Sequence, residues 1–243
     1  MLQAQRCEFL FGTTAPDVQV VSGQLREETH FFCLPIRVSD LPGWEILLSR
    51  YPRLASAERL PVSQAAFLAG YICHIQADWL WIKHIFAPVF GPGCGWGTFQ
   101  ERLYYHNVLR AYLDQQLLPA LSDEMDICLR GVQPDGWLPF VIDDHLCIWR
   151  DFLSTQLEPG AIVKTVEVFS SRQGISAPKY YTLLESTERM QREIFAHIPL
   201  KHLQSYRDTV LDENVRLLTH YMAFALHQKF VLIGGCLVEG DTL

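Results

Sequence analysis

The chain alternates long apolar stretches with short breaks rich in proline and glycine, and the spacing within the stretches is helical. The longest stretch, residues 67–86, reads FLAGYICHIQADWLWIKHIF and contains no proline. A run of this length and composition predicts a helix that is buried on most of its sides. Apolar residues at three- and four-residue intervals predict further helices at 41–51, 99–121, 137–157, 187–197 and 206–228.

Glycine and proline mark the breaks between these segments. Residues 90–97 hold four of the fifteen glycines and predict a loop, and Glu-Pro-Gly at 158–160 interrupts the chain again. Only residues 161–169 show an alternation typical of a strand. We therefore expect an all-α protein that forms a single multi-helix bundle over 1–243. Its metal-site core would cover residues 9–121, and the helices between 137 and 232 would pack on that core.

The longest apolar stretch contains three residues that can bind metal, His74, Asp78 and His84. Because successive helical residues turn by about 100°, Asp78 lies about 40° from His74, and His84 lies about 80° to the other side. A buried carboxylate is costly unless it is paired or bound to a metal. Two imidazoles and a carboxylate on one face of an apolar helix therefore indicate a metal cluster.

Two other interpretations of this helix remain open on its residues alone. One is a membrane-spanning segment, since the run has nearly the length that crosses a bilayer. Asp78, Lys83 and two histidines would make that insertion costly. The other is a satisfied polar pair, in which His74 hydrogen-bonds Asp78 one turn later. The HxxxD spacing does not separate such a pair from a set of metal ligands.

A second polar set precedes the helix, and together the two sets resemble a known family. Residues 12–17 read GTTAPD and end at Asp17, and residues 26–32 read REETHFF and contain His30. A G-x-x-x-P-D segment, a histidine about a dozen residues later and an apolar GY-x-x-H-x-x-x-D helix are similar to the zinc-dependent phospholipase C family, which also resembles the P1-type nucleases. The resemblance covers residues 9–90, over a third of the chain.

The resemblance implies a fold, a ligand set and a reaction. Asp17, His30, His74 and Asp78 correspond to zinc ligands of the family, and His84 stands at the distance of a further family histidine. Asp17 would also orient or deprotonate the attacking water. The implied function is hydrolysis of a phosphodiester, such as a phospholipid, by metal-activated water. Mixed imidazole and carboxylate ligands make zinc the expected cofactor, as one ion or two.

The chain departs from the family at the further metal positions. The family's HxxxE pair is absent, because the histidine that follows His84 is His106 and position 110 is Arg110. No histidine precedes His30, and the chain begins with Met1. We expect a second metal position, if one is retained, to be built from His84 and His106. These departures leave open a different function, that of a non-catalytic helical protein with one structural zinc or none.

Composition narrows the substrate and the compartment. A net charge of −7 and a pI near 5.7 argue against a nucleic-acid surface and disfavour a nuclease. We expect a small-molecule or lipid phosphoester as substrate, with peripheral membrane contact but no transmembrane segment. No signal peptide is visible and the seven cysteines show no CxxC spacing, so we expect a reduced cytoplasmic protein with buried thiols at Cys33, Cys73 and Cys147. A segment preceding Met1 would make a secreted protein the alternative.

One more polar cluster, Asp143-Asp144-His145, requires an interpretation. Such a triplet is typical of a solvated helix start with a capping aspartate, and metal ligation is its alternative. The remaining histidines lack a carboxylate at ligand spacing and are expected to be ordinary surface or core residues, namely His197, His202, His220 and His227.

Overall fold

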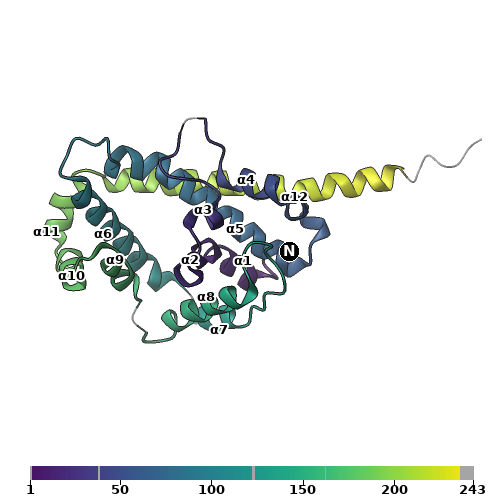
Figure 1. Cartoon of the computed structure of the whole chain (residues 1–243), viewed down its shortest axis with the longest axis horizontal. Coiled ribbons are helices and arrows are strands. Elements are labelled where there is room, and N and C mark those ends of the chain that lie inside the picture. The colour runs from purple at the N-terminus through teal and green to yellow at the C-terminus, as the bar shows by residue number, and fades with distance from the viewer. Residues whose placement is uncertain (1, 38, 122–123, 162, 236–243) are drawn as a thin grey trace, which may run out of the picture. The chain divides into compact units, whose positions relative to one another are not determined.

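The computed structural model describes residues 2–37, 39–121, 124–161 and 163–235, and every regular element within these ranges is helical (Figure 1). The all-α prediction is therefore confirmed for the described residues. The strand-like alternation at 161–169 does not produce a strand over 165–169, where helix α9 (Thr165–Gln173) begins. Helix α9 buries Val166 and Phe169, which lie three residues apart and so share one helical face.

The first half of the chain consists of short helices followed by one long helix. In order these are α1 (Arg6–Gly12), η1 (Ala15–Val18), α2 (Gln19–Ser22), α3 (Arg26–His30), α4 (Gly43–Arg50), η2 (Pro52–Ala55), η3 (Ala57–Arg59) and α5 (Val62–Trp81). The chain then continues without a break as the wider π-helix η4 (Ile82–Phe90), which contains Pro88. The predicted helix at 67–86 thus begins earlier than expected and changes its winding near its end.

The second half contains six more α-helices in addition to α9. These and their short extensions are α6 (Phe99–Leu117), η5 (Leu118–Ala120), α7 (Met125–Arg130), α8 (Asp143–Gln156), α10 (Ala177–Leu184), α11 (Thr187–Met190), η6 (Gln191–Phe195) and α12 (Leu200–Gly235). The helix expected at 137–157 begins only at Asp143, since Pro139 lies in the turn that precedes it. The helix expected at 206–228 is longer at both ends.

The glycine-rich loop between η4 and α6 is present as predicted, and the first residues of α6 hold its end. Thr98 and Glu101 form a capping box, in which the Thr98 N–H donates to Glu101 Oε2 at 2.7 Å and the Glu101 N–H donates to Thr98 Oγ1 at 3.2 Å. The buried guanidinium of Arg102 donates to the carbonyls of Trp96 and Gly97. These contacts satisfy backbone groups that α6 and the loop would otherwise leave without partners.

The chain divides into two compact units. The first comprises residues 1–79, 131–150 and 210–243, and the second comprises residues 80–130 and 151–209. Each unit draws on both the predicted core region and the predicted C-terminal helices. Ring contacts in the first unit join Phe11, Phe67, Tyr71, Trp137 and Phe140. The core of the second unit includes Ile85, Phe90, Tyr104, Leu109, Tyr180 and Leu183.

Two glycines let α1 cross α5 with the two backbones in direct contact. A Cβ atom added to Gly12 would lie 1.9 Å from the carbonyl oxygen of Phe67, and one added to Gly70 would lie 2.0 Å from that of Phe9. No side chain larger than hydrogen fits at either position without moving the backbone. The crossing therefore sets the segment that follows α1 beside the middle of α5.

The cysteines differ in their environments. Cys73 is free and buried, and burial raises the pKa of its thiol to about 12. Cys33 is free but exposed, and Cys147 is half-buried, so the expectation of buried thiols holds for Cys73 alone. Cys7 and Cys128 are disulfide-bonded, so the expectation of a fully reduced chain was wrong for these two residues.

A membrane-spanning segment was one interpretation of the apolar run at 67–86. Among the described residues, no helix has both the length and the apolar composition needed to cross a bilayer. The polar residues within the run instead belong to the site described next.

Candidate metal centre

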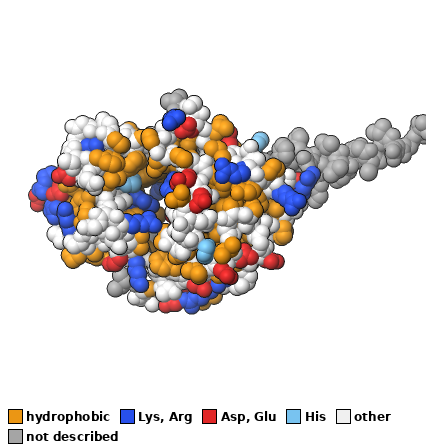
Figure 2. Space-filling view, in the orientation of Figure 1, with side chains coloured by type: hydrophobic (Ala, Val, Ile, Leu, Met, Phe, Trp, Pro, Cys, Tyr) orange, Lys and Arg blue, Asp and Glu red, His pale blue; other side chains and the backbone are white. Residues whose placement is uncertain are grey.

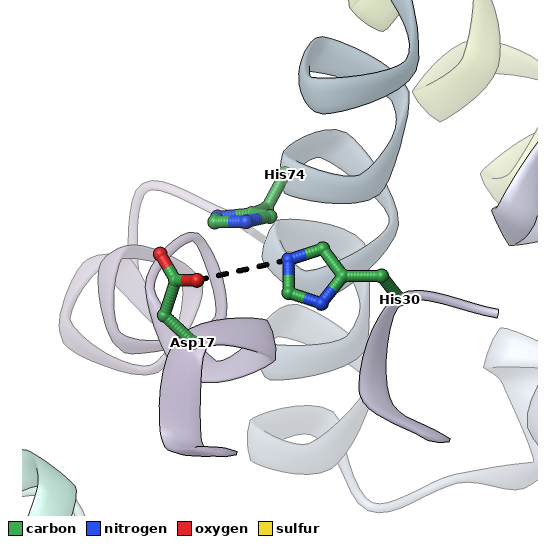
Figure 3. Close-up of side chains that lie close together, drawn as sticks. All are labelled: Asp17, His30 and His74. Carbon is green, nitrogen blue, oxygen red and sulfur yellow. Dashed lines mark ion pairs between the residues drawn. The ribbon is translucent and has the colours of Figure 1, made fainter. Parts of the chain in front are cut away.

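Three residues that lie far apart in the sequence meet in the first unit. Asp17 lies in η1, His30 ends α3, and His74 lies in the middle of α5 (Figure 3). One potential ligand atom from each lies within 4.8 Å of the other two. His30 Nε2 and Asp17 Oδ1 lie 3.7 Å apart. Within the described ranges, this is the only group of three or more histidine, cysteine, aspartate or glutamate residues that is close enough to share an ion.

Asp78 lies beside this cluster, one helical turn after His74. Its Oδ2 atom is 3.4 Å from His30 Nε2 and 3.9 Å from His74 Nε2. The same oxygen accepts a hydrogen bond from Arg26, the first residue of α3. Arg26 was not among the predicted site residues, although it precedes His30 by four residues and therefore shares its helical face. That spacing was the available clue.

Each histidine of the cluster is oriented through its Nδ1 atom. His74 Nδ1 lies 2.8 Å from the carbonyl oxygen of Thr13, the residue that follows the α1–α5 crossing. His30 Nδ1 lies 3.3 Å from the carbonyl oxygen of Arg26 and 3.0 Å from Thr29 Oγ1. A carbonyl oxygen only accepts hydrogen bonds, so we assign the ring proton to Nδ1 in both residues. In the neutral rings, Nε2 then presents a lone pair.

The two Nε2 atoms are the unusual feature of the site. Both are buried, and neither makes a hydrogen bond of good geometry to a described residue, although His30 Nε2 lies 3.4 Å from Asp78 Oδ2. They face the carboxylates of Asp17 and Asp78, so lone pairs are directed at anionic oxygens. Buried polar atoms are nearly always satisfied, and this arrangement requires a cation or a proton between the groups. The same orientation, with Nδ1–H on a carbonyl and Nε2 free, is that of histidines that bind metals.

Further hydrogen bonds hold Asp17 in the cluster. Gln19 Nε2 donates to Asp17 Oδ1 at 3.2 Å, and Thr29 Oγ1 lies 3.2 Å from Gln19 Oε1. Thr29 is fully buried and precedes His30. Gln19 therefore links Asp17 of η1 to Thr29 of α3, in addition to the contact between Asp17 and His30.

Electrostatics favours the protonation states that a metal needs. Burial lowers the pKa of the fully buried His30, which keeps the ring neutral near neutral pH. Burial alone would raise the pKa of Asp78, but His30, His74 and Arg26 together lower it below its usual range. The side chains of Asp17 and Asp78 are 38% and 33% exposed, so the carboxylate side of the cluster is open to solvent. A neutral imidazole and ionised carboxylates are the ligand forms that bind metal.

The structure does not bring His84 and His106 into a second ligand group. His84 lies on η4 and is exposed. His106 is buried on α6, where its Nε2 accepts a hydrogen bond of 2.8 Å from the indole N–H of Trp81. Its ring packs against Phe86 and Phe90, with centroids 5.0 and 5.4 Å apart. No group of three or more potential ligands within the described ranges includes His84 or His106, and the Nε2 lone pair of His106 is already used.

The acidic triplet at 143–145 begins a helix, as its first interpretation proposed. Asp143 is the first residue of α8, and its Oδ2 accepts from the Gly136 N–H at 2.7 Å. No metal-ligand group within the described ranges includes these three residues. His197, His202 and His220 are exposed, and the side chain of His227 lies outside the described residues.

Comparison of the chain with protein-family models, with curated proteins and with solved structures finds no match. The function is therefore argued from the geometry of the centre.

Proposed function

We propose that Asp17, His30 and His74 bind one zinc ion, and that this ion activates water to hydrolyse a phosphoric ester. The observation that carries the proposal is the pair of buried Nε2 atoms of His30 and His74. They have no hydrogen-bond partner and face carboxylates, and the Nδ1 atoms of both rings contact carbonyl oxygens. A metal ion would satisfy both lone pairs and the carboxylate of Asp17 together.

The donor set favours zinc with an open coordination position. Three protein ligands of imidazole and carboxylate type are typical of catalytic zinc sites, which keep a fourth position for water or substrate. Metal–ligand bonds of about 2.0–2.2 Å place the ligand atoms of a tetrahedral site roughly 3.4 Å apart. The 3.7 Å between His30 Nε2 and Asp17 Oδ1 is close to that value. The solvent-exposed carboxylates of Asp17 and Asp78 mark the side from which a substrate would approach.

The residues of the centre would divide the chemical tasks. Bound zinc lowers the pKa of its water towards 7 and so supplies a nucleophile at neutral pH. One carboxylate oxygen of Asp17 would hold the ion, and the other would orient the attacking water. Gln19 fixes the rotamer of Asp17 for this role. Asp78 is a poor general base because its pKa is lowered, and its role is to complete the charge balance around the histidines.

Surface composition favours a small or lipid phosphoester as substrate. Figure 2 shows Lys and Arg side chains in small groups among acidic and apolar ones, without a continuous basic stripe on the face drawn. A nucleic acid would need such a stripe. Leu25, Leu34 and Leu41, in the segments that flank α3, are each more than half exposed. These side chains support peripheral contact with a lipid surface.

One observation favours the alternative, a non-catalytic helical protein with one structural zinc or none. The guanidinium of Arg26 already pairs with Asp78. It neutralises one of the two acids without any metal. A protein that had lost the reaction would keep its fold with such a pair in place.

Metal analysis combined with an activity assay tests the proposal. Purified protein reconstituted with zinc and then desalted should retain one zinc per chain and hydrolyse bis(4-nitrophenyl) phosphate or phosphatidylcholine vesicles. Asp17→Asn should lose both the zinc and the turnover, and Asp144→Asn, a change at an exposed acid outside the centre, should lose neither. Zinc without turnover in the wild type would favour the non-catalytic alternative. A wild type that retains no zinc would refute the metal site.

A further inference from the structure

Arg26 is fixed at the edge of the centre by three contacts. Its carbonyl oxygen lies 3.3 Å from His30 Nδ1, and its Nη2 donates to Asp78. Its guanidinium carbon lies 4.7 Å from the centroid of the Phe32 ring. The backbone of Arg26 is therefore tied to the histidine, and its positive charge is held by the second acid and by an aromatic face.

One nitrogen of the Arg26 guanidinium donates no hydrogen bond to the described residues. A guanidinium carries five N–H donors in a planar fork. Nη2 of Arg26 contacts Asp78, whereas Nη1 is buried and has no hydrogen-bond partner among the described residues. The side chain as a whole is 30% exposed. A buried donor without a partner is costly, and an acceptor oxygen from a ligand would satisfy it.

The charge of the centre also depends on Arg26. With Asp17 and Asp78 ionised and both histidines neutral, Arg26 leaves the centre with one net negative charge, and a divalent ion would make it singly positive. In the absence of Arg26, the metal-loaded centre would be neutral. The whole chain has a net charge of −7, so a positive centre would be a local exception that attracts anions.

From these contacts we propose that Arg26 is the anion-binding residue of the centre, and that its guanidinium contacts a non-bridging oxygen of a phosphate ester held beside the metal. This inference rests on the proposed function. A second cation beside a first metal stabilises the oxygens of a phosphoryl group in dinuclear sites. Because His84 and His106 do not form a second metal position, Arg26 supplies that charge, and its planar fork matches a phosphate.

Phosphate binding to the zinc-loaded protein tests this role, with inorganic phosphate as the probe in isothermal titration calorimetry. Arg26→Gln should retain one zinc per chain, weaken phosphate binding about tenfold or more and raise KM for the phosphodiester. Arg26→Lys should lie between that variant and the wild type. The matched control is Arg50→Gln, since Arg50 also lies over a phenylalanine ring, that of Phe31, but outside the centre. Its phosphate affinity should equal that of the wild type.

The outcomes separate this inference from the proposal on which it rests. If Arg26→Gln keeps both zinc and phosphate affinity, the anion-binding role is overturned and the metal site stands. If Arg26→Gln loses zinc, Arg26 is a positioning residue for Asp78. If the wild type binds no zinc, both proposals fall.

A second measurement on the wild type covers a variant that fails to fold. Phosphate should slow modification of Arg26 by phenylglyoxal in the zinc-loaded protein, with modification sites read by mass spectrometry. Modification of Arg50 should not change. Equal rates at Arg26 with and without phosphate would overturn the inference.

Discussion

The histidines of the metal centre and His106 occupy two regions of the molecule that differ in what meets Nε2. His30 and His106 are both buried, and His74 is nearly so. In the second unit, the indole N–H of Trp81 satisfies Nε2 of His106, and aromatic rings surround the imidazole. In the first unit, Nε2 of His30 and of His74 lies 3.4–3.9 Å from carboxylate oxygens and makes no hydrogen bond of good geometry to a described residue. All three histidines are thus buried or nearly buried and lie on helices. What distinguishes the core histidine His106 from the two candidate ligands is the group that its Nε2 atom contacts.

The largest expected effect is a loss of zinc on mutation of a histidine in the first unit but not of His106 in the second. His74→Ala should abolish zinc binding, and with it the stabilisation of about 2.7 kcal/mol that zinc gives at a concentration one hundred times its Kd. His106→Ala should keep the zinc and lower the free energy of unfolding by about 2–4 kcal/mol, because it leaves a cavity and an unpaired indole N–H. Zinc per chain and urea unfolding with and without zinc measure both effects. Loss of zinc from a folded His106→Ala protein would remove the distinction between the regions.

The next effect concerns the helix crossing that orients His74. Gly70→Ala should destabilise the protein by about 1–3 kcal/mol or more, because the added methyl group would meet the carbonyl oxygen of Phe9. It should also weaken zinc binding, since it displaces the Thr13 carbonyl from His74 Nδ1. Gly93→Ala is the control, because no atom lies within 4 Å of its added Cβ. Equal stability of the two variants in thermal unfolding would contradict the close crossing.

The smallest effect is a dependence of stability on pH. Burial lowers the pKa of His30, so below its ordinary value near 6.5 the unfolded chain binds a proton that the folded chain does not. The free energy of unfolding should therefore be constant above that value and fall by at most about 1.4 kcal/mol per pH unit as the pH drops towards 5. The depressed pKa of Asp78 adds a loss only below about pH 4.

The variant His30→Gln isolates this contribution. Denaturant unfolding between pH 7.5 and 5 should give a flatter curve for the variant than for the wild type. Stability that rises as the wild type is acidified would show that His30 is not held neutral by its burial. Zinc affinity should fall over the same range, since protons compete for the ring nitrogen.

Features that depend on near neighbours in the chain were predictable from the sequence. The apolar run at 67–86 lies within α5 and η4, and the glycines at 91–97 form the loop that precedes α6. Helical geometry alone places His74 and Asp78 one turn apart. The short helices α1, α2 and α3 were not predicted, since elements of four to seven residues are too short for an apolar period to be recognised.

The hydrogen-bond partners of the site could be known only from the tertiary structure. Thr13 and His74 are 61 residues apart, and Arg26 and Asp78 are 52 apart. Both contacts are long-range, and the first follows from a crossing that two glycines allow. The residue types that can bind a metal can therefore be recognised from the sequence. Which nitrogen lone pairs stay free to bind it depends on packing, because a ring nitrogen takes whichever partner the fold brings near it.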